Sequence, residues 1–180
     1  MQVPFAKDSY SSSIPVNWYA AADSDRGVIL LGAPGTVSRL AMPPVEEVRG
    51  IKAVGKYLYV VAGAGVYRIT TGFTATYLGS LNTNTGHVWI ETNGIQIGFV
   101  DGHDYWVYTL SSGAWAQVSD ADFPGASALT YQDGYGAFIN PDTGQFWLTK
   151  LYDFTDITAT DYATAESWPD NLVSIIMNYR

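Results

Sequence analysis

The sequence predicts an all-β fold: a β-propeller with four-stranded antiparallel blades, of which this chain forms an incomplete, N-terminal portion of a ring. The first observation is a repeat with a step of 39 residues, which aligns Ile51 with Ile90 and Leu129. Self-similarity at about 40 residues is typical of a propeller blade. The second is the composition, with 18 Gly, 8 Pro, 7 Phe, 6 Trp and 13 Tyr, which favours short strands and tight turns over long helices.

Each repeat is predicted to be a meander of short strands joined by Gly-rich or Asp-rich turns. The strands of the first repeat are expected near residues 48–54, 57–62, 66–70 and 74–78, with a hairpin turn at Gly63-Ala64-Gly65. Those of the second are expected near 87–91, 95–100, 105–110 and 115–118, with a turn at Asp101-Gly102-His103-Asp104. Those of the third are expected near 126–131, 135–139 and 145–149, with a turn at Asn140-Pro141-Asp142-Thr143-Gly144.

The flanking segments do not follow the repeat. Residues 1–45 are predicted to be an N-terminal arm packed on the propeller, with a short apolar strand at Val28 to Leu31. Residues 46–180 are predicted to hold about three blades and the first strand of a further blade, at 172–177. The segment 151–170 is expected to be irregular. Three blades and a fraction cannot close a ring, so the chain is expected to be part of a longer ring or to be covered by neighbouring chains.

Charge and composition exclude several classes of protein. The formal net charge of -8, with only 9 Lys and Arg, disfavours a specific grip on nucleic acid. No segment approaches the roughly 20 apolar residues that cross a bilayer, so no membrane insertion is expected and the chain is predicted to be soluble and unexported. Cysteine is absent, which removes a disulfide framework and a thiolate nucleophile.

Five stretches in the order of the chain resemble the packaged-DNA stabilization proteins, also called tail accessory or tail hub proteins, of short-tailed bacteriophages. They are Pro15-Val16-Asn17-Trp18-Tyr19, Ala33-Pro34-Gly35-Thr36-Val37, Val48-Arg49-Gly50-Ile51, Gly65-Val66-Tyr67-Arg68-Ile69 and the run from Asp161 to Asp170. The resemblance implies a virion protein that assembles in six copies beneath the portal and its adaptor ring, where it extends the tail and helps to retain packaged DNA.

The same resemblance implies several further properties. Its partners would be other tail and portal-adaptor proteins, and its location the virion tail, with the host cytoplasm during assembly. A tail component requires no catalytic residue, and no cofactor or metal is predicted for the chain. The acidic balance agrees with a tail conduit that repels the DNA backbone and lets the genome slide. Family members are longer than this chain, so ring closure here does not follow from the resemblance.

Histidine chemistry is restricted to two positions, His87 and His103. The turn Asp101-Gly102-His103-Asp104 has metal-ligand types, but Asp-Gly is foremost a turn dipeptide, so no metal site is predicted there. His87 opens a strand and is expected to be structural. Four turn carboxylates would be the candidates for a glycosidase, the third and weakest interpretation: Asp101, Asp104, Asp133 and Asp142.

The densest acidic group comprises Asp153, Asp156, Asp161, Glu166 and Asp170. Carboxylates suit a hard cation such as Ca2+, but their spacing matches no calcium loop. The favoured interpretation is a solvated loop whose Asp residues cap turns, or a short helix around 161–166. Cation binding and a role in an interface both stay open.

Aromatic residues are expected mainly in the core. Tyr67, Trp106 and Phe146 occupy repeat-matched positions and are predicted to pack between blades. Trp89 and Trp147 lie on strands whose alternation could turn them outward. Outward aromatic rings support the main alternative function, a carbohydrate-binding, lectin-like propeller. The sequence therefore predicts a structural phage tail protein, with a glycan-binding module as the alternative.

Overall fold

The computed structural model describes residues 18–23, 25, 27–32, 38–40, 47–165 and 170–178. All regular elements in this part of the chain are β-strands, which confirms the all-β prediction. None of these residues forms a helix that is long and apolar enough to cross a membrane. The chain divides into two compact units, Met1–Arg39 and Leu40–Arg180.

The first unit contains an antiparallel hairpin of β1 (Trp18–Asp23) and β2 (Gly27–Gly32), in which Ala21 pairs with Ile29. Strand β2 confirms the strand predicted at Val28 to Leu31. The quoted stretches 15–17 and 33–37 lie outside the described residues. That this arm packs on the propeller stays a prediction.

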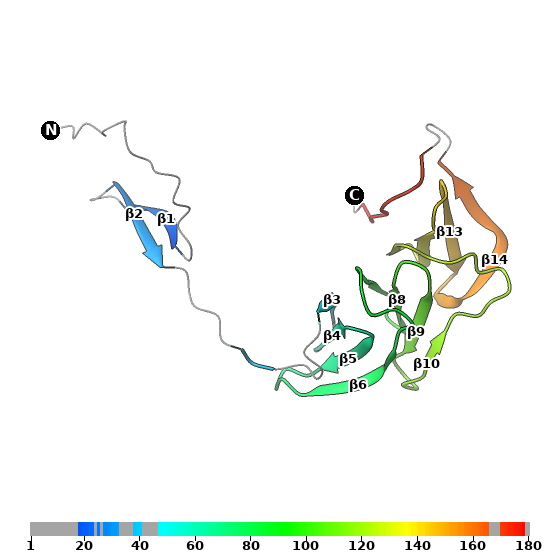
Figure 1. The fold of residues 1–180 in the computed structure, drawn as a ribbon, viewed down its shortest axis with the longest axis horizontal. Helices are drawn as coiled ribbons and strands as arrows, with labels where there is room; N and C mark the ends of the chain where they lie inside the picture. The colour runs from blue at the N-terminus through cyan, green and yellow to red at the C-terminus, as the bar shows by residue number, and fades with distance from the viewer. Residues whose placement is uncertain are drawn as a thin grey trace. The chain divides into compact units, whose positions relative to one another are not determined.

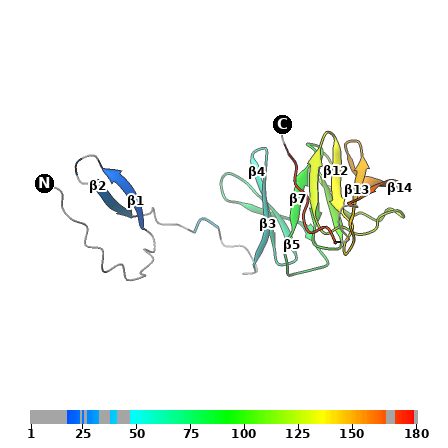
Figure 2. The same ribbon diagram turned by 90° about the horizontal axis from the view of Figure 1, so that it is seen from above.

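The second unit contains three four-stranded antiparallel sheets, each with its strands in sequential order (Figures 1 and 2). Sheet 1 consists of β3 (Val48–Val54), β4 (Tyr57–Ala62), β5 (Gly65–Ile69) and β6 (Ala75–Ser80). Sheet 2 consists of β7 (Trp89–Thr92), β8 (Gln96–Val100), β9 (Tyr105–Thr109) and β10 (Trp115–Gln117). Sheet 3 consists of β11 (Leu129–Gln132), β12 (Tyr135–Ile139), β13 (Gln145–Lys150) and β14 (Asp153–Thr164).

The strands predicted for the three repeats are all present, with bounds that differ by at most three residues. The turns also lie where they are predicted, and Gly63, Gly102 and Asp142 have the positive φ that these tight turns require. The three sheets fan out side by side as propeller blades do (Figure 1). The four-stranded propeller blade is therefore the repeating unit of the fold.

The prediction for residues 151–170 is wrong over most of its length. Instead of an irregular segment, residues 153–164 form β14, a strand of 12 residues at the edge of sheet 3. The helix expected around 161–166 is likewise absent, because 161–164 continue this strand, while Glu166 to Pro169 lie outside the described residues. Residues 170–178 have no regular secondary structure, and their prediction as the first strand of a further blade stays a prediction.

Two apolar clusters join the sheets. The cluster between sheets 1 and 2 contains Tyr59, Val61, Val66, Leu81, Val88, Ile90, Ile97, Phe99 and Tyr108. The cluster between sheets 2 and 3 contains Val100, Tyr105, Val107, Val118, Ala126, Leu129, Phe138, Trp147, Phe154 and Ile157. Sheet 2 thus contributes both of its faces to the core. Sheets 1 and 3 each have a described neighbour on one face only.

The third repeat differs from the first two by two residues in one hairpin. Val60 pairs with Tyr67 in sheet 1, and Phe99 pairs with Trp106 in sheet 2. In sheet 3 the partner of Phe138 is Trp147, because the β12–β13 turn is two residues longer. Trp147 therefore occupies the position of Trp106.

The structure corrects the expectations for two aromatic residues. Trp147 is only 9% exposed and belongs to the core, so the prediction that it turns outward is wrong. Its ring stacks on that of Tyr162, with ring centroids 5.0 Å apart. Phe146 lies on the opposite face of sheet 3, away from sheet 2, where it lines a groove. The packing of Phe146 between two blades is therefore not seen among the described residues.

Replacing Tyr105 by Phe is expected to leave the free energy of unfolding unchanged at pH 7, or to raise it by up to about 1 kcal/mol. Tyr105 is fully buried, and its hydroxyl has no hydrogen-bond partner among the described residues. Burial, with a smaller contribution from Asp153, raises the pKa of Tyr105 well above its usual value. Urea unfolding of both proteins, with Tyr77→Phe as an exposed control, measures the effect.

The same pair of proteins gives a pH test. The unfolded tyrosine ionises near pH 10, whereas the buried one resists ionisation. Below about pH 10 the tyrosine is neutral in both states, and its ionisation does not affect the free energy of unfolding. Above that pH it ionises in the unfolded state, so the free energy of unfolding falls as the pH rises. The advantage of Tyr105→Phe should grow above that pH. A loss of more than about 1 kcal/mol at pH 7 would show instead that the hydroxyl has a partner.

Candidate functional site

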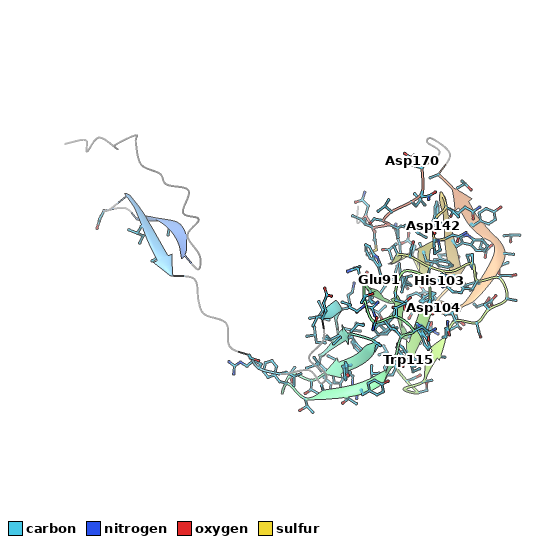
Figure 3. All side chains as sticks on the ribbon, viewed as in Figure 1. Glu91, His103, Asp104, Trp115, Asp142 and Asp170 are labelled. Carbon is cyan, nitrogen blue, oxygen red and sulfur yellow. The ribbon has the colours of Figure 1, made fainter. Side chains whose placement is uncertain are left out.

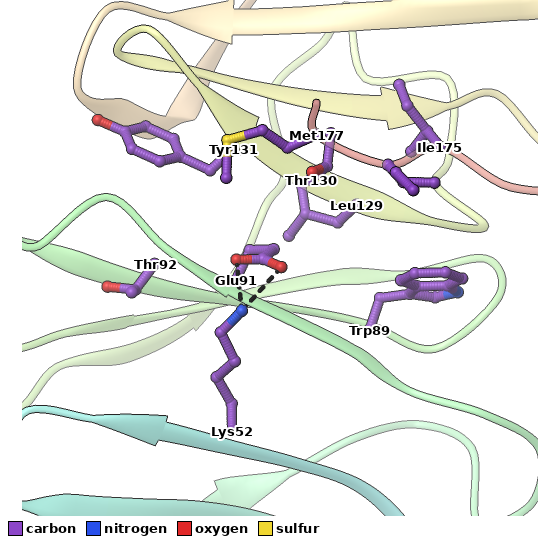
Figure 4. Close-up of a pocket in the computed structure, with 10 residues that line it drawn as sticks. Lys52, Trp89, Glu91, Thr92, Leu129, Thr130, Tyr131, Ile175 and Met177 are labelled. Carbon is purple, nitrogen blue, oxygen red and sulfur yellow. Dashed lines mark hydrogen bonds and ion pairs between the residues drawn. The ribbon is translucent and has the colours of Figure 1, made fainter. Parts of the chain in front are cut away.

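The first strands of the three sheets lie next to one another, since β7 contacts both β3 and β11. Together with residues 175–177 they line a cavity of about 460 Å3, the axial groove (Figure 4). Its walls are formed by Lys52, Trp89, Glu91, Thr92, Leu129, Thr130, Tyr131, Ile175, Ile176 and Met177. The groove is thus built from equivalent strands of successive blades.

An ion pair crosses this groove between sheets 1 and 2. The Nζ atom of Lys52 lies 2.9 Å from both carboxylate oxygens of Glu91, and the two side chains are 36% and 24% exposed. These residues are 39 positions apart and hold the same place in successive repeats, with Thr130 in the third. The pair leaves the charged part of the groove neutral. The groove is therefore better suited to hold a ligand by contact and stacking than to transfer a proton, because the one carboxylate of its lining is already paired with Lys52.

The turn Asp101-Gly102-His103-Asp104 is held by protein donors. Asp101 is 7% exposed and accepts hydrogen bonds from the Thr83 hydroxyl (2.7 Å) and the Asp104 backbone N–H (2.9 Å). Asp104 accepts a hydrogen bond from the Asn82 amide (2.6 Å) and lies 3.0 Å from His103 Nδ1. Each carboxylate oxygen of the turn therefore has a protein partner. The described residues contain no group of three or more His, Cys, Asp or Glu that could hold a metal ion.

The buried residue that sequence reasoning missed is Arg49. Its guanidinium donates hydrogen bonds to the carbonyl oxygens of Gly63 (2.9 Å), Thr83 (2.8 Å), Thr85 (2.6 Å) and Gly86 (2.7 Å), and to the Thr83 hydroxyl (2.7 Å). Arg49 is 4% exposed. It ties sheet 1 to the loop that leads to sheet 2. The signal was present, since Arg49 stands in one of the stretches that resemble the phage proteins.

The neighbouring Gly50 lies where β3 comes closest to the start of β7. A Cβ atom at Gly50 would lie 2.6 Å from the backbone oxygen of Val88, where no real Cβ atom fits. The backbone N–H of Val88 donates to the carbonyl of Arg49 (3.0 Å) at the same place. Arg49 and Gly50 together allow β3 to approach the start of β7. The stretch Val48 to Ile51 is therefore a junction between two blades.

The acidic group at 153–170 does not converge on one point. Asp153 accepts hydrogen bonds from Thr155 and Gln96, and these lower its pKa although its burial acts in the opposite direction. Asp161 pairs with Lys150 at 2.7 Å, and this hydrogen bond raises the pKa of the lysine. Asp156 and Asp170 are exposed. Glu166 lies outside the described residues.

The remaining candidates are distributed over separate turns. Asp133 and Asp142 occupy positive-φ positions in two different turns of sheet 3. Figure 3 shows His103 and Asp104 side by side and Asp170 far from them. His87 is exposed, and its ring meets that of Trp89 edge to face at 5.1 Å. With Trp147 buried, the carbohydrate-binding alternative depends on Trp89.

The two terminal sheets each present an open face, meaning the face turned away from sheet 2. On sheet 1 this face includes Ile51 and Tyr77, which are 60% and 58% exposed. On sheet 3 it contains a groove of about 590 Å3 lined by Tyr135, Phe146, Leu148, Thr149, Lys150, Leu151, Thr160, Asp161, Tyr162 and Ala163. On the same face of sheet 1, Val60 and Ile69 are buried, at 3% and 8% exposed.

Comparison with protein families decides the relationship. The family model described as "Bacteriophage P22 Gp10, beta-propeller" matches residues 1–179. The chain belongs to this phage stabilisation family. Family membership confirms the resemblance and the propeller fold, and it makes the chain a structural protein of a bacteriophage, a component of the virion. No curated protein matches the chain.

Solved structures resemble this member of the phage stabilisation family in fold alone. The computationally designed Ika8 protein has a TM-score of 0.55 at 8% identity, over 92% of this chain and 51% of that chain. Kluyvelomyces marxianus Hsv2 has a TM-score of 0.53 at 11% identity, over 86% and 48%. A chain of the nidogen/laminin complex has a TM-score of 0.52 at 14% identity, over 87% and 62%. The chain thus spans 48% to 62% of the length of these structures.

Proposed function

We propose that the chain is a subunit of the phage tail hub at the head-tail connection, where it helps to close the portal channel and retain packaged DNA. The family match over residues 1–179 is the observation that carries this proposal. By resemblance, six copies assemble beneath the portal and its adaptor ring. The partners are therefore other copies of the chain and the neighbouring tail and portal-adaptor proteins.

The chemistry of the surface supports a role through shape and contact. The axial groove has its lysine and its carboxylate paired with each other, and the acidic turn at 101–104 is occupied by protein donors. The open faces of sheets 1 and 3 expose apolar side chains suited to protein contact. The net charge of -8 disfavours retention of DNA by a direct grip.

The test uses a phage that encodes this chain. Particles assembled without it should package DNA and then lose it, so that the genome becomes sensitive to added nuclease. Expression of the protein from a plasmid should restore nuclease resistance and plaque formation. Cryo-electron microscopy of the complemented particles should place the protein below the portal and adaptor. Particles that lack the protein yet keep a nuclease-resistant genome would contradict the proposal.

A glycan array distinguishes the carbohydrate-binding alternative from the tail-hub proposal. Binding of purified protein to a glycan, lost on Trp89→Ala and kept on Trp106→Ala, would favour that alternative. Trp89 lines the axial groove, whereas Trp106 stacks on Trp115 within the core between sheets 1 and 2. The tail-hub proposal expects no specific glycan binding.

A further inference from the structure

We propose that Asn93 is a site of spontaneous deamidation, that the junction between sheets 2 and 3 slows this reaction, and that the product carboxylate weakens the same junction. Asn93 precedes Gly94 in the β7–β8 turn of sheet 2. The inference concerns the chemistry of this chain alone and does not depend on the tail-hub function.

The sequence at this turn is the one most prone to the reaction. Asn93-Gly94 is the only Asn-Gly step in the sequence, since the other asparagines are followed by Trp, Thr, Pro, Leu or Tyr. Glycine has no side chain to hinder its backbone nitrogen, which therefore reaches the amide of a preceding asparagine more readily than the nitrogen of other residues does. Gly94 has a φ of 86° and is exposed, so water reaches the turn.

The reaction needs only water. The backbone nitrogen of Gly94 gives up its proton to water and forms a bond to Cγ of Asn93, while the bond from Cγ to the side-chain nitrogen breaks. Ammonia leaves with a proton returned by water. The resulting succinimide ring takes up a water molecule and opens. Opening at one carbonyl gives aspartate, and opening at the other gives isoaspartate, whose main chain is longer by one carbon atom.

Both groups that must react are held by hydrogen bonds in the folded chain. The side-chain oxygen of Asn93 accepts hydrogen bonds from the backbone N–H groups of Ile95 (2.9 Å) and Gln96 (2.6 Å). The backbone N–H of Gly94 donates to the Thr92 hydroxyl (3.1 Å), which retains the proton that this nitrogen has to lose. The ring therefore forms when the turn opens, and the rate follows the population of the open turn.

Contacts with sheet 3 hold the turn in this conformation. The side-chain nitrogen of Asn93 donates to the backbone carbonyl of Tyr152 (3.0 Å), in the β13–β14 turn, and to the side-chain oxygen of Gln96 (3.2 Å). Gln96 reaches the same part of sheet 3, since its oxygen accepts from the backbone N–H of Phe154 (2.7 Å) and its nitrogen donates to Asp153 (3.2 Å). Opening of the turn thus requires sheets 2 and 3 to part at this end.

The product does not fit this junction. A carboxylate has no N–H to donate, so an oxygen in place of the amide nitrogen would face the carbonyl of Tyr152 and the side-chain oxygen of Gln96, which are both acceptors. Gln96 cannot turn its own amide to compensate without losing its hydrogen bonds to Phe154 and Asp153. Isoaspartate also lengthens the turn. The reaction therefore makes an otherwise reversible opening permanent.

Peptide mass spectrometry of the full chain, aged in mildly alkaline buffer, measures the reaction through the mass gained when OH replaces NH2. We expect Asn93 to deamidate in guanidinium-unfolded protein and at least about tenfold more slowly in folded protein. Gln96→Ala removes a partner of the Asn93 amide and should raise the rate in the folded state by about threefold or more. Gln117→Ala, at an exposed position of the same sheet, should leave the rate unchanged. Circular dichroism checks that both variants fold.

Asn93→Asp reproduces one product and should unfold at a lower urea concentration than the native protein. Gln117→Glu makes the same chemical change at the exposed position and should not. If Asn93→Asp does not fold, the deamidated fraction of aged wild-type protein, separated by ion exchange, replaces it in the same measurement.

Three results would overturn the proposal. Equal rates of deamidation in folded and unfolded protein would show that the fold does not slow the reaction. An unchanged rate in folded Gln96→Ala would show that the junction with sheet 3 is not what slows it. Unfolding of the deamidated protein at the urea concentration of the native protein would show that the junction tolerates the carboxylate.

Discussion

Replacing Arg49 by Ala is expected to lower the free energy of unfolding by about 3–4 kcal/mol, the largest effect of any side-chain truncation we predict. The guanidinium donates to four buried or half-buried carbonyl oxygens and one hydroxyl. Without it the buried carbonyl of Gly63 loses its partner out of contact with water, and the half-buried acceptors of the loop lose the group that holds them against sheet 1. Urea unfolding, followed by tryptophan fluorescence, gives the measurement.

Two further variants isolate the cause. Arg49→Lys keeps the charge but loses the planar fork, so it should recover less than half of the loss. Lys56→Ala removes an exposed cation from the same sheet and should change the free energy of unfolding by less than about 0.5 kcal/mol. If Arg49→Lys were as stable as the native protein, charge alone would explain the role of Arg49, and the proposed hydrogen-bond network would be wrong.

Replacing Gly50 by Ala is expected to cost about 2–3 kcal/mol. The added methyl group would lie 2.6 Å from the backbone oxygen of Val88, and a backbone atom cannot move aside as a flexible side chain can. Strands β3 and β7 would have to separate, which weakens the cluster between sheets 1 and 2. The midpoint of urea unfolding should fall at an unchanged dependence on denaturant.

Gly72→Ala is the matched control for this prediction. Gly72 stands in the β5–β6 turn of the same sheet, where an added Cβ atom would meet only the Thr70 hydroxyl oxygen, at 3.8 Å. Its replacement should change stability by less than about 1 kcal/mol. Equal losses in Gly50→Ala and Gly72→Ala would point to a general effect on the backbone, and would argue against close approach of the two strands as the cause.

The repeat made most of the fold predictable. A step of 39 residues fixed the blade, and within each blade the turn residues marked where strands begin and end. Strands in the middle of a sheet bury side chains on both faces and carry a strong apolar pattern, as β4 and β8 do. Those strands were predicted almost to the residue for this reason.

Strand β14 escaped prediction because it lies at the edge of its sheet. An edge strand has one neighbour and wide contact with water, so polar and charged residues are tolerated and even favoured there. Of its 12 residues only Phe154 and Ile157 are buried, and they do not alternate regularly. Its Asp and Thr content therefore looks like that of a loop.

The turns around the candidate site could be predicted, but the side chains that line it could not. The position of the turn Asp101 to Asp104 was predicted correctly, and its carboxylates accept hydrogen bonds from two side chains and one backbone N–H. The prediction failed for Trp147, because alternation along a strand separates two faces but does not say which of them the neighbouring sheet covers, and the face of Trp147 packs against sheet 2. The sequence also gave no reason to expect a role for Arg49, because most of its acceptors are backbone carbonyl oxygens, which every residue type has.

The ion pair of Lys52 and Glu91 limits how the number of repeat units in such a chain can change. Because the two charges stand at one place in successive units, losing the middle unit would set Lys52 beside Thr130 and strand an ammonium group without a counterion. Duplicating the first unit would set two lysines against each other. Loss of the middle unit or duplication of the first would therefore require a compensating substitution at this place.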